Sequence, residues 1–266
     1  MISDFHLHTS YSGDSDTPMK DMIERGIHLG LPAMCFTDHF DMDYPKEPEL
    51  FLLDTERYYE DIMTLKHTYK NEIELLFGVE LGLQPHLGKQ CTEFVRQFPF
   101  DFIIGSSHVV NGIDPYYPAY YENRSEEEAY TAYFASIIDN LQTFSDFDVY
   151  GHIDYVVRYG PHKNLQYSYE RYKDILDNIL KLCIEKGIGI ELNTGGLAYG
   201  LGQPHPHPDI IQRYRQLGGE ILTIGSDAHS PDRLAYEFSG MPELLKQCGF
   251  SYYTIFKKRK AEFVKL

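Results

Sequence analysis

Seven short apolar runs recur along the chain, and a longer amphipathic segment follows each of them. Each run is rich in Ile, Val, Phe or Leu, which is typical of strands that are buried on both faces of a parallel sheet. The runs cover residues 2–6, 33–37, 73–79, 101–106, 147–151, 188–192 and 221–225. The sequence therefore predicts parallel strands that alternate with helices.

The segments between the runs carry helix signals. Thr-Pro at residues 17–18 predicts an N-cap followed by the first helical position. The pattern Ser-Glu-Glu-Glu at 125–128 is a capping box that opens a helix through about residue 141. Apolar residues recur at helical spacing over 172–183. Ser-Pro at 230–231 predicts the start of a last long helix.

The length of the chain, 266 residues, is usual for one β/α barrel. We therefore predict a single domain over residues 1–266, folded as a distorted (β/α)7 TIM-like barrel. In such barrels the functional residues lie at the C-terminal ends of the strands. An open doubly wound sheet is the structural alternative, but it usually has a Gly-rich phosphate loop after the first strand. Here the first run leads into His-Leu-His at residues 6–8 instead.

Charge and composition exclude several classes of protein. The 24 basic and 40 acidic residues give a net charge of −16, so we expect neither a nucleic acid nor a membrane as partner. A small phosphate ester stays possible because bound metal ions invert the local field. The chain begins without a signal peptide pattern and has no apolar run of about 18 residues. Four widely spaced cysteines indicate free thiols, and we predict a cytoplasmic location. The oligomeric state is left open.

Metal-ligating side chains stand at the ends of six of the seven runs. In chain order, the ends carry His6 and His8, Asp38 and His39, Glu80, His108, His152 and Asp154, Asn193, and Asp227 and His229. Residues two apart on a strand point to the same face, so both imidazoles of His6-Leu-His8 can reach one ion. Imidazoles and carboxylates without thiolates suit Zn²⁺, Mn²⁺ or Fe²⁺. Because these ligands outnumber the four to six positions around one ion, we predict more than one metal ion.

These motifs resemble the polymerase and histidinol-phosphatase (PHP) family of metal-dependent phosphoesterases. The resemblance rests on His6-Leu-His8, Thr37-Asp38-His39, Gly78-Val-Glu80, Ser107-His108, Gly151-His152-Ile-Asp154 and Gly225-Ser-Asp227-Ala-His229. It covers residues 2 to about 230 and implies a seven-stranded barrel that holds two to three divalent ions.

The resemblance also implies how the ligands divide among the ions. One ion takes His6, His8, Glu80 and Asp227, a second shares Glu80 and adds His108 and His152, and a third takes Asp14, His39 and His229. Asp14 departs from the family, which often has histidine at this position, so the third ion is expected to be a harder one such as Mn²⁺ or Fe²⁺.

Segments 107–117, 151–160 and 191–194 are similar to stand-alone histidinol-phosphate phosphatases of that family. This resemblance implies hydrolysis of L-histidinol phosphate to L-histidinol and inorganic phosphate by a metal-activated water, with Glu80 bridging two ions. Arg158 is expected to face the phosphate, since a guanidinium group matches phosphate oxygens bidentately. A surface salt bridge is the alternative role for Arg158. The leaving-group acid is Asp154 or a metal-bound water.

Three further residues are candidates for substrate contacts. Asn193 stands at the only strand end without a metal ligand and is able to donate a hydrogen bond. His205 lies in the rigid loop 203–206, which is expected to overhang the barrel mouth. Tyr117 belongs to the tyrosine-rich segment 114–121, which either forms an aromatic wall for an imidazole or simply packs.

Other functions stay open at this point. The main alternative is a PHP phosphoesterase that acts on a nucleotide, a sugar phosphate or phosphotyrosine. A carbon–nitrogen hydrolase on a similar barrel would normally use a metal-bridging lysine on the fourth strand, and none stands near Ser107 and His108. A non-catalytic binding domain is expected to lose ligands, whereas every ligand position here holds a competent residue.

Overall fold

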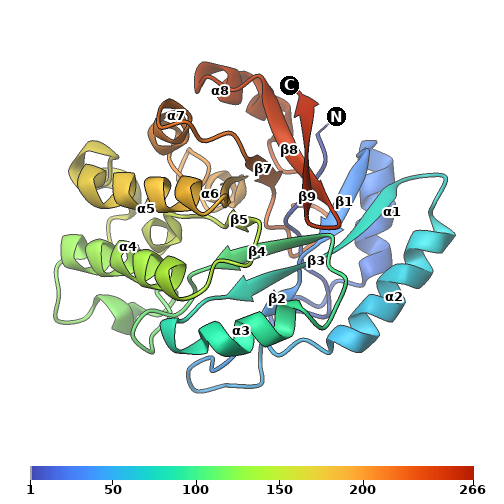
Figure 1. Ribbon diagram of the computed structural model, residues 1–266, viewed down its shortest axis with the longest axis horizontal. Helices are drawn as coiled ribbons and strands as arrows, with labels where there is room; N and C mark the ends of the chain where they lie inside the picture. The colour runs from blue at the N-terminus through green and yellow to red at the C-terminus, as the bar shows by residue number, and fades with distance from the viewer. Residues whose placement is uncertain (1) are drawn as a thin grey trace.

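The computed structural model describes residues 2–266, in which a curled parallel sheet is surrounded by helices (Figure 1). The strands of this sheet are β1 (Ala33–Phe36), β2 (His39–Phe40), β3 (Glu74–Gly82), β4 (Phe102–Ser106), β5 (Val149–Tyr150), β6 (Gly189–Asn193) and β7 (Leu222–Gly225). They pair in parallel in the order β1-β3-β4-β5-β6-β7, and β2 pairs with the later part of β3. The two short strands β1 and β2 together occupy the position of the predicted second strand.

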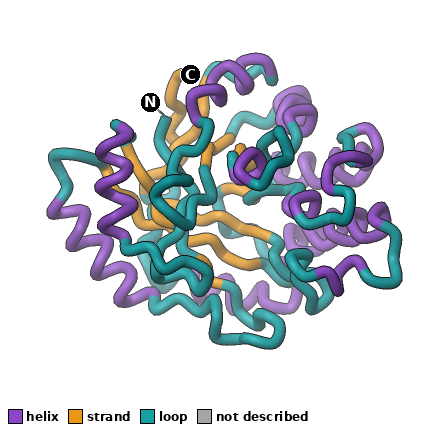
Figure 2. The backbone as a smooth tube through the Cα atoms, turned by 180° about the vertical axis from the view of Figure 1, so that it is seen from behind, coloured by secondary structure: helices purple, strands orange, loops and turns teal. Residues whose placement is uncertain are grey.

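The amino-terminal segment 2–8 joins the two edges of this sheet. Asp4 forms a parallel bridge with Met34 in β1, and Leu7 forms one with Ala228 just after β7. The predicted first strand is therefore present only as isolated bridges, yet it lies where the first strand of a barrel belongs. Seen from behind, the strands lie inside and the helices outside (Figure 2). The prediction of a TIM-like β/α fold with seven strand positions is confirmed.

Helices follow most of the strands, as the alternation predicts. They are α1 (Met19–Leu29), α2 (Thr55–Thr68), α3 (Gly88–Val95), α4 (Glu126–Thr143), α5 (Lys173–Glu185), α6 (Gly195–Ala198), α7 (Pro208–Gln216) and α8 (Met241–Gln247). Short 3-10 turns are η1 (Pro85–Leu87), η2 (Pro118–Tyr121), η3 (Tyr155–Arg158), η4 (Lys163–Gln166), η5 (Glu170–Tyr172) and η6 (Phe238–Gly240). The capping box at the start of α4 is confirmed, because Ser125 and Glu128 make both of its hydrogen bonds.

Two helix predictions are wrong. Pro18 is the N-cap of α1 rather than its first residue, and the hydroxyl of Thr17 donates to the carbonyl of His229 instead of capping the helix. No long helix begins at Ser230. The chain forms turns there, since Ala235 has a φ of 52°, which a right-handed helix does not allow.

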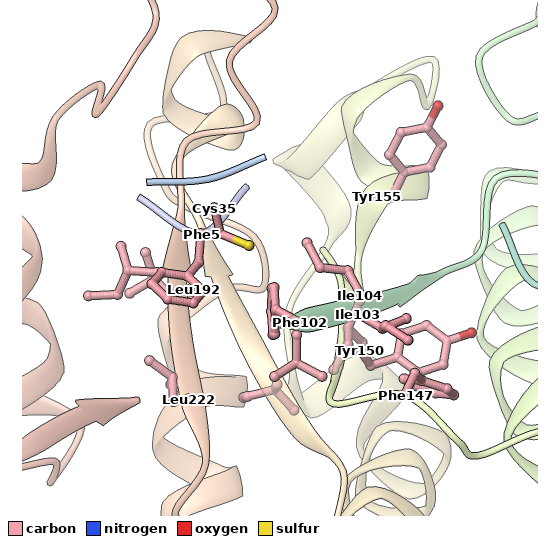
Figure 3. Close-up of a cluster of buried hydrophobic side chains, with 14 of the residues drawn as sticks. Phe5, Cys35, Phe102, Ile103, Ile104, Phe147, Tyr150, Tyr155, Leu192 and Leu222 are labelled. Atoms are coloured by element: carbon pink, nitrogen blue, oxygen red, sulfur yellow. The ribbon is translucent and has the colours of Figure 1, made fainter. Parts of the chain in front are cut away.

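Side chains from several strands pack in the buried core. Phe5 and Phe102 meet edge to face with ring centroids 5.3 Å apart, and Leu192 from β6 joins the same buried cluster (Figure 3). All three are fully or almost fully buried. This packed core separates the two ends of the barrel.

The C-terminal residues form a hairpin of β8 (Tyr252–Lys257) and β9 (Lys260–Lys265). Its turn reaches the start of β4 (Figure 1), where the backbone N–H of Arg259 donates to the carbonyl of Asp101 at 2.9 Å. The hairpin therefore packs against the amino ends of the strands. No helix in residues 2–266 has the length and apolarity needed to cross a membrane.

Candidate active site

Glu80 is the centre of the polar cluster at the carboxyl end of the barrel. It lies inside β3, two residues before the strand ends at Gly82, and is fully buried. Its Oε1 lies 3.2 Å from His108 Nε2 and 2.9 Å from His152 Nε2. Its Oε2 faces three other rings and lies 3.2 Å from His6 Nε2, 3.5 Å from His8 Nε2 and 3.0 Å from His39 Nδ1. Five imidazole rings from four strand positions and their following loops therefore surround one carboxylate.

Asp14, Asp227 and His229 complete the cluster from the open side. Asp227 Oδ1 lies 3.4 Å from His8 Nε2, and Asp14 Oδ2 lies 3.1 Å from His229 Nε2 and 3.6 Å from His39 Nε2. The side chain of Asp14 is 42% exposed, whereas Glu80 is closed off from solvent. The structure thus brings together all nine side chains that the sequence marked as candidate ligands.

The geometry of the cluster fits divalent ions. His6 Nε2 and His8 Nε2 lie only 3.1 Å apart. Two ligand atoms about 2.0–2.1 Å from one ion, at angles between octahedral and tetrahedral, are separated by about 2.9–3.4 Å. Glu80 Oε2 and His229 Nε2 are buried without a hydrogen-bond partner in residues 2–266. Buried polar atoms are rarely left so, and an ion accounts for both observations.

Three-residue sets with mutually close ligand atoms occur at four places in this cluster. They are His8, His39 and His229; His6, His8 and Glu80; His39, Asp41 and His108; and Glu80, His108 and His152. These sets overlap, and together they offer too many ligands for one ion. The cluster is therefore suited to several adjacent ions.

Without ions, the carboxylates would hold protons on these histidines. Burial alone lowers the pKa of His6 and His39, but nearby carboxylates outweigh it, so that both pKa values are raised well above the usual value. Burial raises the pKa of Glu80, but the surrounding imidazoles outweigh it and the pKa is lowered. Divalent cations that replace these protons satisfy the same carboxylates, so metal binding and proton release are coupled here.

Two carboxylates that orient the histidines were missed by the sequence reasoning. Asp41 Oδ2 lies 2.6 Å from His108 Nδ1, and Glu191 Oε1 lies 2.6 Å from His6 Nδ1. A carboxylate on Nδ1 fixes the ring so that Nε2 faces the cluster. The available signal was spacing: Asp41 comes two residues after His39, so its side chain has the same-face spacing that marked the histidine pairs.

Arg158, at the end of η3, borders the cluster. Its side chain is buried, and Nη2 donates to Asp227 Oδ2 at 3.1 Å. Its guanidinium carbon lies 4.3 Å from the ring centroid of Tyr199. Burial lowers the pKa of Arg158, but Asp227 and the neighbouring tyrosines raise it by a larger amount. The guanidinium group therefore stays charged. A surface salt bridge, the alternative for Arg158, does not describe this position.

His205 and Asp154 support Arg158 from behind. His205 is fully buried: its Nδ1 lies 2.5 Å from Asp154 Oδ1, and its Nε2 accepts a hydrogen bond from Arg158 Nε at 3.3 Å. Asp154 Oδ2 also accepts the backbone N–H of His207 at 2.9 Å. Neither residue lines the cavity described below. The expectation that His205 overhangs the mouth is therefore wrong, and the carboxylate of Asp154 contacts His205 and His207 instead of the cavity.

Asn193 is likewise held inside the protein. Its Oδ1 accepts the backbone N–H of Gly195 at 2.8 Å, and its Nδ2 donates to Glu191 Oε2 at 3.1 Å. The side chain is fully buried and does not border the cavity. The expected substrate contact of Asn193 is therefore corrected to a contact that positions Glu191. Burial of a polar strand end cannot be read from the sequence alone.

A cavity of about 400 Å³ opens over the cluster. Its lining combines six of the nine cluster residues with Arg158 and a mainly aromatic and acidic wall. The full lining is Asp14, His39, Asp41, Tyr44, Leu50, Phe51, His108, Asp114, Tyr116, Tyr117, His152, Tyr155, Arg158, Tyr159, Tyr199, Asp227 and His229. Tyr117, predicted as a substrate contact, is part of this wall. The cavity is large enough for a small molecule and gives it access to both Arg158 and the cluster.

The sequence profile of the PHP domain matches residues 4–195. The chain belongs to the PHP family. A probable histidinol-phosphatase of Clostridium acetobutylicum is 30% identical, over 99% of this chain and 100% of that protein. A histidinol-phosphatase of Lactococcus lactis is 29% identical, over 97% of this chain and 96% of its own length.

The solved structures give the same family likeness. The histidinol phosphate phosphatase of Lactococcus lactis, crystallised with zinc, L-histidinol and phosphate, superposes with a TM-score of 0.89. It is 28% identical, and 98% of each chain is covered. A second structure, from Listeria monocytogenes, has a TM-score of 0.77 at 18% identity and supports the PHP fold alone.

Proposed function

We propose that this PHP protein is a histidinol-phosphatase, which hydrolyses L-histidinol phosphate to L-histidinol and inorganic phosphate in the biosynthesis of histidine. The observation that carries the proposal is the shared cavity, which is bordered by the buried, charged Arg158 and by six residues of the ligand cluster. A phosphate ester in this cavity can meet both. The relatives that match over their full length support the choice of ester.

We assign the nine clustered residues to two to three divalent ions, Zn²⁺, Mn²⁺ or Fe²⁺. The division that the family resemblance implies agrees with the distances around Glu80 and Asp14. When bound, such ions would lower the pKa of a water toward about 7 and neutralise charge on the phosphate. Glu80 holds the first two ligand sets together, since its two oxygens face different histidines.

Arg158 is proposed to bind the non-reacting phosphate oxygens. A guanidinium group offers parallel N–H donors that match two phosphate oxygens, and its charge opposes the charge that gathers on the phosphoryl group. Asp154 and His205 are positioning residues in this account. Asp154 accepts the Nδ1 proton of His205, which leaves Nε2 free to accept from Arg158. The guanidinium plane is therefore fixed before the substrate arrives.

Residues 1–266 form one catalytic domain in this proposal, and its partner is a small-molecule phosphate ester. A cytoplasmic location is supported by the state of the cysteines. Cys35, Cys91, Cys183 and Cys248 are all free and buried. Free thiols are usual in a reducing compartment, where a biosynthetic enzyme would meet its substrate.

The test is phosphate release by the purified protein reloaded with Zn²⁺, Mn²⁺ or Fe²⁺. L-histidinol phosphate is compared with a nucleotide, a sugar phosphate and phosphotyrosine. We expect a preference in kcat/KM of about 10²-fold or more for L-histidinol phosphate. Turnover of the other esters but not of L-histidinol phosphate would keep the phosphoesterase and overturn the assignment to histidine biosynthesis. Absence of all turnover in metal-loaded protein would overturn both.

A further inference from the structure

Asp114 is a buried carboxylate in the cavity wall with no cationic partner. The residue is 5% exposed and borders the cavity. Within residues 2–266, no lysine, arginine or histidine nitrogen lies within 4.0 Å of its oxygens. Buried carboxylates are otherwise paired or neutral, because an isolated buried charge is costly.

The hydrogen bonds around Asp114 favour the ionised form. Tyr44 Oη donates to Oδ2 at 2.8 Å, the backbone N–H of Tyr116 donates to Oδ1 at 2.7 Å, and Tyr155 Oη donates to Oδ1 at 3.4 Å. All three neighbours are donors, which suits a carboxylate that accepts on both oxygens. Burial still raises the pKa of Asp114 above its ordinary value, outweighing these hydrogen bonds and the charge of His108, which lower it. A cation placed beside the carboxylate would relieve this cost.

Tyr155 places Asp114 at a definite distance from Arg158. The guanidinium carbon of Arg158 lies 5.4 Å from the ring centroid of Tyr155, and the hydroxyl of the same ring reaches Asp114. The anion-binding and acidic parts of the cavity are thus separated by one tyrosine side chain. A ligand that carries a phosphate and a positive charge a few bonds apart can contact both.

The aromatic wall of the cavity also suits a cation. Tyr116, Tyr117 and Tyr159 line it together with Tyr155, and their rings meet edge to face. Aromatic faces attract ammonium groups, and the attraction strengthens when water is excluded. The lysine nitrogen of Lys46 already lies 5.5 Å from the ring centroid of Tyr117 at the edge of this wall.

We propose that Asp114 is a specificity-determining residue that binds the ammonium group of an amino-alcohol phosphate while Arg158 holds its phosphate. This inference rests on the proposed function, because L-histidinol phosphate carries both groups. It adds a reason for selectivity: a nucleotide or sugar phosphate brings no cation to the carboxylate and would leave it buried and unpaired. The same carboxylate repels any second anionic group.

The experiment compares two substrates in one metal-loaded, full-length variant, Asp114→Asn. L-histidinol phosphate carries the ammonium group, whereas p-nitrophenyl phosphate carries no cation. L-histidinol is titrated separately as an inhibitor of p-nitrophenyl phosphate hydrolysis, which probes the cation subsite without turnover of the natural substrate. Asp43→Asn is the matched control, since this exposed aspartate contacts His86 and does not border the cavity.

For Asp114→Asn we expect KM for L-histidinol phosphate and the inhibition constant of L-histidinol to rise about 10- to 100-fold. The kcat/KM for p-nitrophenyl phosphate stays within about twofold of the value of the parent protein. The control Asp43→Asn changes the kinetic constants of neither substrate. An unchanged preference between the two substrates in Asp114→Asn overturns the inference.

Two further outcomes are separated by design. Hydrolysis of p-nitrophenyl phosphate but not of L-histidinol phosphate by the parent protein overturns the proposed function itself. Loss of both activities in Asp114→Asn points to a folding defect, and Asp114→Glu then decides. If a carboxylate at this position binds the ammonium group, Asp114→Glu retains a preference for L-histidinol phosphate. Loss of that preference with intact p-nitrophenyl phosphate hydrolysis contradicts the inference.

Discussion

The two ends of the barrel both bury carboxylates, but the chain satisfies them differently. At the amino end, Asp148 Oδ2 accepts the backbone N–H of Ile103 at 2.8 Å and lies 2.6 Å from Arg259 Nε. At the carboxyl end, Glu80 Oε2 has no hydrogen-bond partner in the described part of the chain, although three imidazole rings face it. The first carboxylate is paired with a guanidinium group and a backbone donor, whereas the second is surrounded by imidazoles that can exchange their protons for metal ions.

The difference extends to the shape of each end. The C-terminal hairpin packs against the amino end, where the backbone N–H of Lys258 donates to Asp101 Oδ1 at 3.0 Å. The carboxyl end holds the cavity of about 400 Å³. Asp227, at that end, has a φ of 57°, an uncommon value for a residue other than glycine. Such local strain is typical of functional sites, where the surrounding structure maintains it.

The largest effect is expected for Glu80→Gln. The amide removes the charge that five imidazole rings share, so ion content and kcat/KM should fall, the latter by about 10³-fold or more. The free energy of unfolding of the ion-free protein should also fall, because the fold holds Glu80 ionised and the imidazoles around it lose their shared carboxylate. Metal analysis, kinetics and thermal melting measure the three quantities. Substantial turnover with full metal loading would contradict the role of Glu80.

A smaller effect is expected for Asp154→Asn. An asparagine amide can donate to Nδ1 of His205, which moves the ring proton to Nε2 and removes the acceptor for Arg158 Nε. We expect a loss of about 10-fold in kcat/KM, mainly as a rise in KM. Arg158→Ala is the reference and should lose more, about 10²-fold or above.

A leaving-group acid and a positioning residue differ in the kinetic signature of Asp154→Asn. An acid would lower kcat and spare activated esters such as p-nitrophenyl phosphate, whose leaving group needs no proton. A positioning residue affects both esters alike. A kcat effect confined to L-histidinol phosphate would return Asp154 to the role of acid.

The smallest effect on turnover is expected for Arg259→Ala, at the opposite end of the barrel. Asp148 loses its cation and stays buried, so the free energy of unfolding should fall by about 2–3 kcal/mol. The kcat/KM of the folded protein should be unchanged. Arg171→Ala is the control, because its ion pair with Glu127 is exposed and should contribute little to the free energy of unfolding. Chemical denaturation measures both, and an equal loss in the two variants would contradict the comparison.

The strand ends were predictable because chemistry and periodicity agree there. His6 and His8 lie on the same face of one strand position, and the carboxylates near them would be costly to bury in an apolar core. Asp41 and Glu191 were missed because they act through another side chain, and the same-face spacing of Asp41 after His39 does not by itself show that its carboxylate orients an imidazole.

Burial is the property that misled the other predictions. Asn193 and His205 were placed at the cavity because they follow the sixth strand, yet backbone hydrogen bonds between the two residues hold both inside. The position of the C-terminal hairpin was also not predictable. It depends on contacts between Arg259 and aspartates more than 100 residues earlier in the chain.

The most direct test of the whole account is removal and return of the metal ions. The purified protein is stripped with a chelator, then reloaded with Zn²⁺, Mn²⁺ or Fe²⁺ while bound metal and hydrolysis of L-histidinol phosphate are measured together. The account predicts two to three ions per chain, turnover that falls by about 10³-fold or more on stripping, and recovery on reloading. Full turnover of L-histidinol phosphate by the stripped protein would contradict it.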